Sequence, residues 1–200
     1  LVIKPSSDTP WIPYFIAEIF QEAGIPDEVV SFVTGPGGTT GQALVDSPEV
    51  DGITFTGSFP VGMGIYRSFA QGTYVRPIIL EMGGKNPTIV TKNADLEDAA
   101  LGIVRSAFGL QGQKCSACSR VFVQAPMYDK LVERIVDLTK KLSVGDPTLQ
   151  DTYMGPVINK RSYSEYQEFC ADLSKNAKIL TGGKVLTDGE YANGFYCEPT

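Results

Sequence analysis

The amino-acid sequence predicts an α/β fold of mostly parallel, open sheets with flanking helices. Short apolar runs alternate with segments of helical spacing through the first hundred residues, which is the pattern of βαβ units. Turns rich in glycine separate these segments. With 200 residues, 42% of them hydrophobic, the chain can bury a substantial core. We therefore expect a folded protein that consists of one large domain or of parts of two.

The first half of the chain contains four predicted strands and two well-delimited helices. Residues 11–23 carry apolar side chains at helical spacing between Pro10 and Gly24, which stands at the expected C-cap. Ser58 follows a strand and is expected to cap a helix that runs to about Ala70. The four predicted strands are residues 1–3, 29–33, 52–56 and 77–80, the last of which ends on Glu81.

The second half continues the alternation after a predicted domain boundary. Gly83 and Gly84 follow a strand and let the backbone change direction, so we place the boundary between residues 1–82 and residues 83–200. The strands predicted after it are residues 88–90 and 120–124, and the helices are residues 94–110, 128–142 and 160–175.

The composition excludes several functional classes. Seventeen basic and 23 acidic residues give a net charge of −6, which leaves no broad cationic surface for nucleic acid. The absence of histidine removes every mechanism and metal site that needs imidazole. No apolar run reaches the roughly 20 residues of a membrane-spanning helix. Four cysteines are too few for a disulfide scaffold and no signal peptide precedes them, so a reducing cytoplasm is the expected compartment.

Cys115 is the candidate nucleophile. It lies in a polar, glycine-flanked loop between a predicted helix and a predicted strand. Lys114 and Arg120 are close in sequence, and a positive surrounding favours the thiolate, which is the reactive form of cysteine. The alternative is a buried cysteine that serves only as a small apolar residue.

The other cysteines, Cys118, Cys170 and Cys197, leave two further interpretations open. Cys115 and Cys118 have the C-x-x-C spacing of a redox dithiol. The same pair is also half of a four-thiolate zinc site that the other two cysteines would complete. The nearness of Cys118 to Cys115 permits an oxidised, inactive disulfide.

Glu81 is the candidate general base. It ends an apolar strand, and open α/β sheets bind their ligands at the carboxyl ends of strands. In a chain without histidine, a carboxylate is the natural base. The alternative is a carboxylate in solvent that is paired with Lys85.

Three strand ends are candidates for nucleotide binding. Residues 57–62 follow a strand and open a helix, whose free N–H groups suit a pyrophosphate. Their spacing is not the usual dinucleotide fingerprint, so an ordinary strand-to-helix turn explains them as well. Residues 35–41 are either a close approach to a nucleotide or a tight turn. Lys4, at the end of the first strand, either reaches a ribose or phosphate or remains exposed.

Five motifs occur in one order along the chain. They are Lys4-Pro5-Ser6, Phe55-Thr56-Gly57-Ser58, Glu81-Met82-Gly83-Gly84-Lys85-Asn86-Pro87, Gly112-Gln113-Lys114-Cys115 and Glu198-Pro199-Thr200. This order and the spacing from Glu81 to Cys115 resemble the aldehyde dehydrogenase superfamily from end to end. Residues 83–86 and 109–120 are most similar to the 1-pyrroline-5-carboxylate dehydrogenases. The resemblance implies a Rossmann-like fold of the aldehyde dehydrogenase type, in which residues 1–82 belong to the NAD(P)-binding domain and residues 83–200 to the catalytic domain.

The resemblance also implies a reaction, the oxidation of an aldehyde to a carboxylic acid with NAD or NADP. The thiolate of Cys115 would attack the aldehyde to form a thiohemiacetal, and Glu81 would activate the water that hydrolyses the resulting acyl-thioester. The backbone N–H of Cys115 would help to stabilise the oxyanion. The expected substrate is 1-pyrroline-5-carboxylate or glutamate semialdehyde, an intermediate of proline catabolism, and no metal is expected.

The cofactor-binding residues are likewise implied by the resemblance. They are Lys4, Ser6 and Ser7 near the adenosine ribose, Gly37 and Val61 near the adenine, Gly57 and Ser58 near the pyrophosphate, and Met82 beside the nicotinamide. Many NAD-preferring relatives have glutamate at the position of Ser7, so the choice between NAD and NADP stays open.

Parts of the family pattern lie outside these 200 residues. They are an upstream asparagine of the oxyanion hole, a downstream cofactor-binding glutamate and the oligomerisation strand. We therefore expect this segment alone to be a weakly active or inactive nucleotide-binding fragment. We expect its parent chain to form a homo-oligomer that acts on a small molecule and binds neither nucleic acid nor a membrane.

Overall fold

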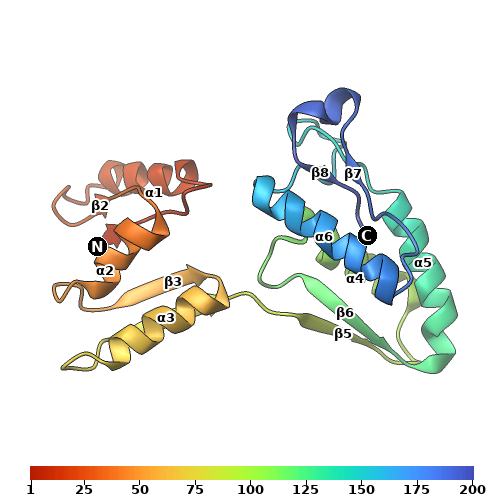
Figure 1. Ribbon diagram of the computed structural model, residues 1–200, viewed down its shortest axis with the longest axis horizontal. Coiled ribbons are helices and arrows are strands. Elements are labelled where there is room, and N and C mark those ends of the chain that lie inside the picture. Colours follow the sequence, from red (N-terminus) through yellow and green to blue (C-terminus); the bar gives the residue numbers. More distant parts are fainter. The chain divides into compact units, whose positions relative to one another are not determined.

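The computed structural model describes all 200 residues, which divide into two compact units (Figure 1). The first unit is Leu1–Met82 and the second is Gly83–Thr200, so the division falls where the glycine pair begins. No helix in either unit is both long and apolar enough to span a membrane.

The first unit consists of two parallel strand pairs and three helices. Strand β1 (Val2–Ile3) pairs with β2 (Ser31–Phe32), and β3 (Ile53–Gly57) pairs with β4 (Ile78–Met82). The helices are α1 (Trp11–Glu22), α2 (Gln42–Asp46) and α3 (Phe59–Ala70). The predicted strand over residues 29–33 is therefore shorter than expected, whereas α1 ends close to Gly24, whose φ of 83° stops the helix.

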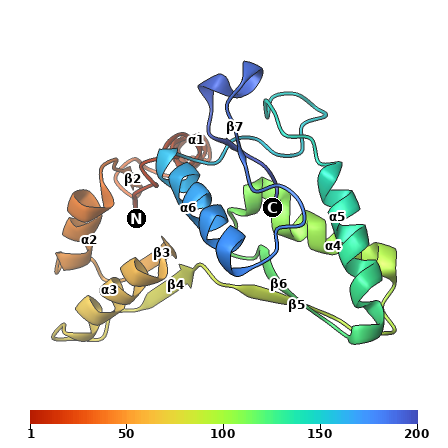
Figure 2. The same ribbon diagram turned by 45° about the vertical axis from the view of Figure 1, so that its right-hand side comes forward.

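Helix α3 covers the β3–β4 pair and forms the core of the first unit with it (Figure 2). Val45, Ile65 and Phe69 are buried there. Gly62 permits the close approach of α3, because a β-carbon at this position would lie 2.5 Å from Met82 Sδ. The carboxyl ends of β3 and β4 lie side by side, since Gly57 is the register partner of Met82.

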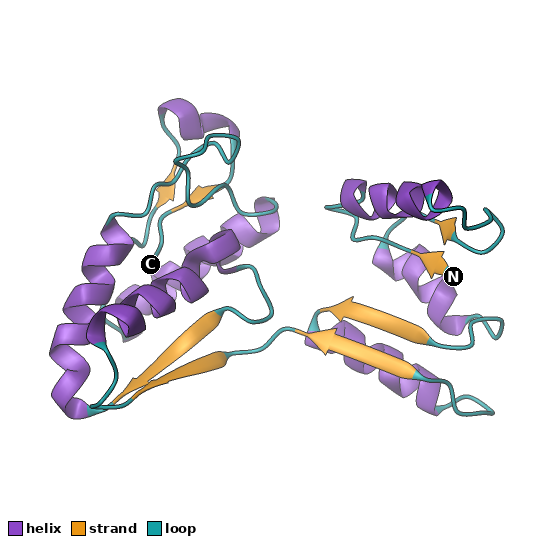
Figure 3. Ribbon diagram, turned by 180° about the vertical axis from the view of Figure 1, so that it is seen from behind, coloured by secondary structure: helices purple, strands orange, loops and turns teal.

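The second unit places its helices on one side of a parallel strand pair (Figure 3). The pair is β5 (Asn86–Val90) with β6 (Cys118–Val123), and β7 (Val185–Leu186) pairs with β8 (Tyr196–Cys197) in the antiparallel direction. The helices are α4 (Leu96–Phe108), α5 (Tyr128–Lys140) and α6 (Lys160–Asn176). Three of the four strand pairs are thus parallel, which confirms the predicted fold class.

The β5–β6 pair is covered on one face only. Val90 of β5 is buried against Ala100, Ile103 and Leu131 of the two helices α4 and α5. On the opposite face, Ile89 of β5 is 74% exposed. Helix α4 starts with a strong cap, because the Asp95 carboxylate accepts hydrogen bonds from the second and third N–H groups of the helix.

A bulge interrupts the pairing of β5 with β6. The register shifts by one residue between Asn86 and Pro87, and Ser119 of β6 is the extra residue. Pro87 has no N–H to donate to the ladder, and proline in a strand is tolerated at such a bulge. As a result Cys118 and Val121, three residues apart, both pack against the buried core.

Candidate active site

A left-handed turn ends α4 and leads the chain into the loop of Cys115. Leu110, Gln111 and Gly112 have φ values of 51°, 56° and 68°. Helix α4 therefore ends at Phe108, two residues before the predicted end, because a right-handed helix cannot continue through such residues. Two consecutive non-glycine residues in this conformation store backbone strain, which is typical of functional sites.

Cys115 is exposed on the loop that follows this turn. Its carbonyl oxygen accepts a hydrogen bond of 2.6 Å from the side-chain amide of Asn86. Its backbone N–H donates to no protein group and so remains available. An accessible thiol beside a free N–H is the pairing that nucleophilic attack on a carbonyl needs.

The two basic residues near Cys115 in sequence, Lys114 and Arg120, each contact another part of the chain. The guanidinium of Arg120 donates to the carbonyl oxygen of Lys85 at 2.8 Å. The amino group of Lys114 lies beside Gly109, where a β-carbon would be 3.3 Å from Nζ. The predicted loop of Cys115 is thus a structured segment that lies between α4 and the bulged strand pair.

Cys118 has a different environment from Cys115, although the two are close in sequence. It is the first residue of β6, and its thiol lies between the hydroxyl of Thr88, which donates to Sγ at 3.2 Å, and the carbonyl of Arg120. It packs against the core, and the structure records it as a free thiol. The sequence motif alone did not reveal that this cysteine belongs to a strand.

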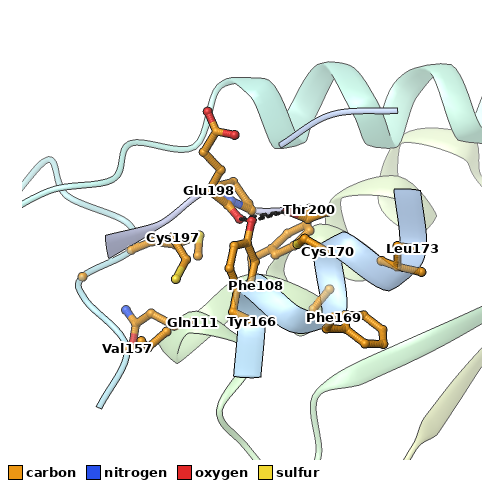
Figure 4. Close-up of a pocket in the computed structure, with 14 residues that line it drawn as sticks. Phe108, Gln111, Val157, Tyr166, Phe169, Cys170, Leu173, Cys197, Glu198 and Thr200 are labelled. Carbon is orange, nitrogen blue, oxygen red and sulfur yellow. Dashed lines mark hydrogen bonds between the residues drawn. The ribbon is translucent and has the colours of Figure 1, made fainter. Parts of the chain in front are cut away.

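Cys170 and Cys197 line a cavity of about 210 Å³ within the second unit (Figure 4). Both are free thiols, with 6% and 5% of their surface exposed. The hydroxyl of Tyr166 in this cavity donates to the carbonyl of Glu198 at 2.8 Å and shares a hydrogen bond of 2.6 Å with Thr200. No group of three or more cysteine, aspartate or glutamate side chains could hold a metal ion, so the four cysteines do not form the alternative zinc site.

Burial makes the Cys197 thiol and the Tyr166 hydroxyl in this cavity weaker acids than usual. It raises the pKa of the Cys197 thiol from 9.0 to about 11, and the neighbouring Cys170 adds to the effect. Burial is also the largest cause that raises the pKa of Tyr166 well above its ordinary value. Since the thiolate is the reactive form, Cys197 is unreactive at neutral pH.

At the end of β1, the side chain of Lys4 joins two neighbouring loops. Its ammonium group donates to the carbonyls of Pro5, at 2.7 Å, and Gly35, at 3.1 Å. Ser7 donates to the same carbonyl of Gly35 at 3.4 Å. An ammonium group has three donors, so one donor of Lys4 remains for a ligand. The structure thus brings Lys4 and Ser7 together, as a site at these strand ends requires.

The glycine-rich turn after β2, residues 35–41, has features of both interpretations of the sequence, a tight turn and a close approach to a nucleotide. Gly35 has a φ of 147°, and a β-carbon there would lie 2.0 Å from Thr40 Oγ1, so the turn itself requires glycine. Gly37 faces open space, because no atom lies within 4 Å of its β-carbon position. A planar group could therefore approach the backbone at Gly37.

Helix α3 offers its N-terminus to a ligand. Ser58 occupies the N-cap position, but its side chain makes no capping hydrogen bond, which corrects the predicted cap. The N–H groups of Phe59 and Val61 in the first turn of α3 therefore have no side-chain partner, while Pro60 between them has no N–H; free N–H groups at a helix start bind phosphate. This chemistry fits the pyrophosphate of a dinucleotide.

The remaining candidate residues are distributed over the first unit. Val61, in the first turn of α3, is 52% exposed. Ser6 is exposed after β1, where its hydroxyl accepts a hydrogen bond from the N–H of Asp8. Met82 is half-buried against α3, and Glu81 is exposed on β4. Glu81 belongs to the first unit and Cys115 to the second.

Comparisons with known proteins match the whole chain. The model of the aldehyde dehydrogenase family matches residues 1–200. The 1-pyrroline-5-carboxylate dehydrogenase of a Geobacillus species is 44% identical over 204 aligned residues, and that of Anoxybacillus flavithermus is 43% identical. Each alignment covers 100% of this chain and 39% of the relative, so the chain spans about two fifths of the length of these relatives.

Solved structures agree with this result. The 1-pyrroline-5-carboxylate dehydrogenase from Thermus with bound NAD superposes with a TM-score of 0.90 at 36% identity, over 99% of this chain and 38% of that one. Betaine aldehyde dehydrogenase from Staphylococcus aureus in complex with NAD+ gives 0.93 at 32% identity, over 100% and 39%. PnpE in complex with nicotinamide adenine dinucleotide gives 0.93 at 38% identity, over 99% and 40%.

Proposed function

Because the chain belongs to the aldehyde dehydrogenase family, we propose that its protein oxidises an aldehyde to a carboxylic acid with NAD or NADP. In this proposal residues 1–82 are part of the cofactor-binding domain and residues 83–200 are part of the catalytic domain. The single observation that carries it is the exposed thiol of Cys115 beside its own free N–H.

Cys115 is the proposed nucleophile. Its thiolate adds to the aldehyde carbon, and the carbonyl oxygen becomes an oxyanion that the N–H of Cys115 stabilises. Loss of hydride from the resulting thiohemiacetal leaves an acyl-thioester on Cys115. Cys118 takes no part, because its thiol packs into the core side of β6. The proposed mechanism thus needs Cys115 alone, whereas a redox dithiol would need both Cys115 and Cys118.

Glu81 is the proposed general base for hydrolysis of the thioester. Its carboxylate takes a proton from water, the water oxygen adds to the acyl carbon, and the carboxylic acid leaves as the thiol is restored. Glu81 is exposed at the carboxyl end of a parallel strand pair, where open sheets bind their ligands.

The first unit is the proposed cofactor site. NAD or NADP supplies the hydride acceptor when it is bound. Lys4, Ser6 and Ser7 would hold the adenosine ribose, and Gly37 and Val61 would contact the adenine. Gly57, the last residue of β3, and Ser58, the N-cap of α3, would hold the pyrophosphate, and Met82 would border the nicotinamide. The uncapped helix end and the spare donor of Lys4 support this arrangement.

The proposed substrate is 1-pyrroline-5-carboxylate, in its open form glutamate semialdehyde. The relatives of 43 to 44% identity carry this name, as does the Thermus structure. The fold alone does not select it, because a betaine aldehyde dehydrogenase superposes equally well. Substrate choice therefore has to be measured against other aldehydes.

The test is the reduction of NAD and NADP, followed by absorbance, with pyrroline-5-carboxylate, betaine aldehyde and a simple aliphatic aldehyde. It is made on this chain and on any longer form of the protein. We expect Cys115→Ala to abolish turnover and Cys118→Ala to leave it within about threefold, while both variants retain dinucleotide binding.

Three outcomes separate the candidates. Turnover by Cys115→Ala would contradict the aldehyde dehydrogenase mechanism. Equal damage by Cys118→Ala and Cys115→Ala would favour the redox dithiol. Dinucleotide binding by this chain without turnover, with turnover in a longer form, would identify these 200 residues as a nucleotide-binding fragment.

A further inference from the structure

Asn86, the first residue of β5, forms hydrogen bonds with the loop of the proposed nucleophile. Its Nδ2 atom donates two hydrogen bonds, to the carbonyl of Cys115 at 2.6 Å and to the carbonyl of Ala117 at 3.1 Å. A side-chain amide has two N–H donors, so both are used on this one loop. No other side chain donates a hydrogen bond to the carbonyl of Cys115.

The C-terminal end of the loop is also bound by a side chain of α4. The N–H of Cys118 donates to Ser106 Oγ of α4 at 3.2 Å. The peptide group between Ala117 and Cys118 is therefore fixed at its carbonyl by Asn86 and at its N–H by Ser106. A turn closed by the N–H of Ala117 on the carbonyl of Lys114, at 3.2 Å, spans Cys115 between these contacts.

The bulge in β5–β6 brings the amide of Asn86 to this position. Asn86 is the register partner of Cys118, whereas Pro87 is already shifted by the extra residue Ser119. Asn86 is also half-buried, so water reaches it only in part. Loss of its donors would leave the Cys115 carbonyl without a protein donor and the Ala117 carbonyl with only the 3.5 Å hydrogen bond from Ser119 Oγ.

We propose that Asn86 is a positioning residue for Cys115, which fixes the Cys115 carbonyl and thereby the direction in which the thiol and the free N–H of Cys115 point. This inference rests on the proposed role of Cys115 as nucleophile. Asn86 touches no reacting atom. Misplacement of a reacting group by about 1 Å costs on the order of 100-fold in rate, so the two hydrogen bonds affect the rate constant rather than the binding of substrate.

The test compares Asn86→Asp and Asn86→Leu with Thr88→Val as the matched control. Thr88 lies on the same strand, and its hydroxyl contacts the same segment, but at Cys118 Sγ rather than at Cys115. Hydrogen exchange of residues 109–118, measured by mass spectrometry on this chain, reports the loop without any turnover. We expect both Asn86 variants to raise exchange there about tenfold or more, with α5 and α6 unchanged, and Thr88→Val to leave the loop near wild type.

Turnover is measured in whichever form of the protein reduces the cofactor. We expect kcat to fall about 100-fold in both Asn86 variants with KM within about threefold. Aspartate cannot donate when ionised but can donate once protonated, so the kcat of Asn86→Asp relative to wild type rises as the pH falls, whereas that of Asn86→Leu does not. Urea unfolding of both variants over the same pH range separates this effect on kcat from a loss of folded protein.

The outcomes distinguish the two proposals. Turnover by Cys115→Ala overturns the proposed function, whatever Asn86 does. If Cys115→Ala is inactive but both Asn86 variants keep wild-type kcat or wild-type loop exchange, the positioning role alone is wrong. If Asn86→Leu does not fold, the nearly isosteric Asn86→Asp decides the question by itself.

Discussion

Gly112 approaches Ala107 so closely that a β-carbon at Gly112 would lie 2.8 Å from the carbonyl oxygen of Ala107. Gly112 also has a φ of 68°, which is unfavourable for any other residue. This contact closes the left-handed turn between α4 and the loop of Cys115. The turn therefore requires a residue without a β-carbon at position 112.

Gly112→Ala is expected to lower the free energy of unfolding by about 2 kcal/mol, because it combines backbone strain with a contact that is too short. Gly102→Ala is the matched control, since Gly102 lies inside α4 with no atom within 4 Å of its β-carbon position. Alanine there should stabilise the protein by about 0.5 to 1 kcal/mol. Urea unfolding of both variants measures the two values, and equal effects would contradict the close approach at Gly112.

Iodoacetamide is expected to modify Cys115 well before the cavity cysteines. Cys115 is exposed, whereas Cys170 and Cys197 are 6% and 5% exposed. Reaction of the two buried thiols requires local opening, which we expect to slow it at least about 100-fold. Peptide mapping after timed alkylation gives the three rates. Comparable rates for all three cysteines would mean that the cavity is open in solution.

The stability of the protein should decrease in alkaline solution through Cys197. Burial raises its pKa from 9.0 to about 11, so the folded state favours the protonated thiol. This contribution is fully present below pH 9 and is lost as the pH rises toward 11. Unfolding of wild type and Cys197→Ala in urea with a reducing agent, at several pH values, isolates the effect as a difference. We expect wild type to lose stability relative to the variant over this range; a constant difference would contradict the raised pKa.

Ser7→Glu tests the cofactor site and follows from the proposed function. A carboxylate at the end of β1 can accept hydrogen bonds from ribose hydroxyls and repels a 2′-phosphate. We expect the ratio of the dissociation constants for NADP and NAD to rise about tenfold or more, measured by calorimetric titration. Thr73→Glu, an exposed change of the same charge in the same unit, should leave the ratio unchanged. An equal shift in both variants would exclude a local role for Ser7.

The sequence predicts those parts of the fold that depend on local patterns. The parallel strands follow from alternating apolar runs, and α1 ends at Glu22, two residues before Gly24, because glycine adopts a positive φ easily. The left-handed turn was missed, since Leu110 and Gln111 have no preference for that conformation. With its amide oxygen toward Gly155, Gln111 accepts a hydrogen bond of 2.7 Å from the N–H of that residue, a contact 44 positions away that no local pattern reveals.

The candidate site shows the same division. Cys115 could be identified from residue type and from its loop, because the chemistry of a thiol is visible in the sequence. The role of Asn86 depends on register with β6 and became apparent only from the paired strands. Pro87 directly precedes the predicted strand over residues 88–90 and carried a usable signal, since proline in a sheet is confined to edge strands, strand starts and bulges.

The bulge at Ser119 also restricts how the gene for this chain can change in length. Side chains alternate between the two faces of a strand, so deletion of Ser119 would leave Cys118 and Val121 two residues apart, both still on the core face of a now regular strand. Deletion of Phe122, in contrast, would place Val121 and Val123 on opposite faces, although both pack against the core. Among homologous genes, loss of codon 119 should therefore be accepted, and single insertions or deletions should be purged between codons 121 and 123.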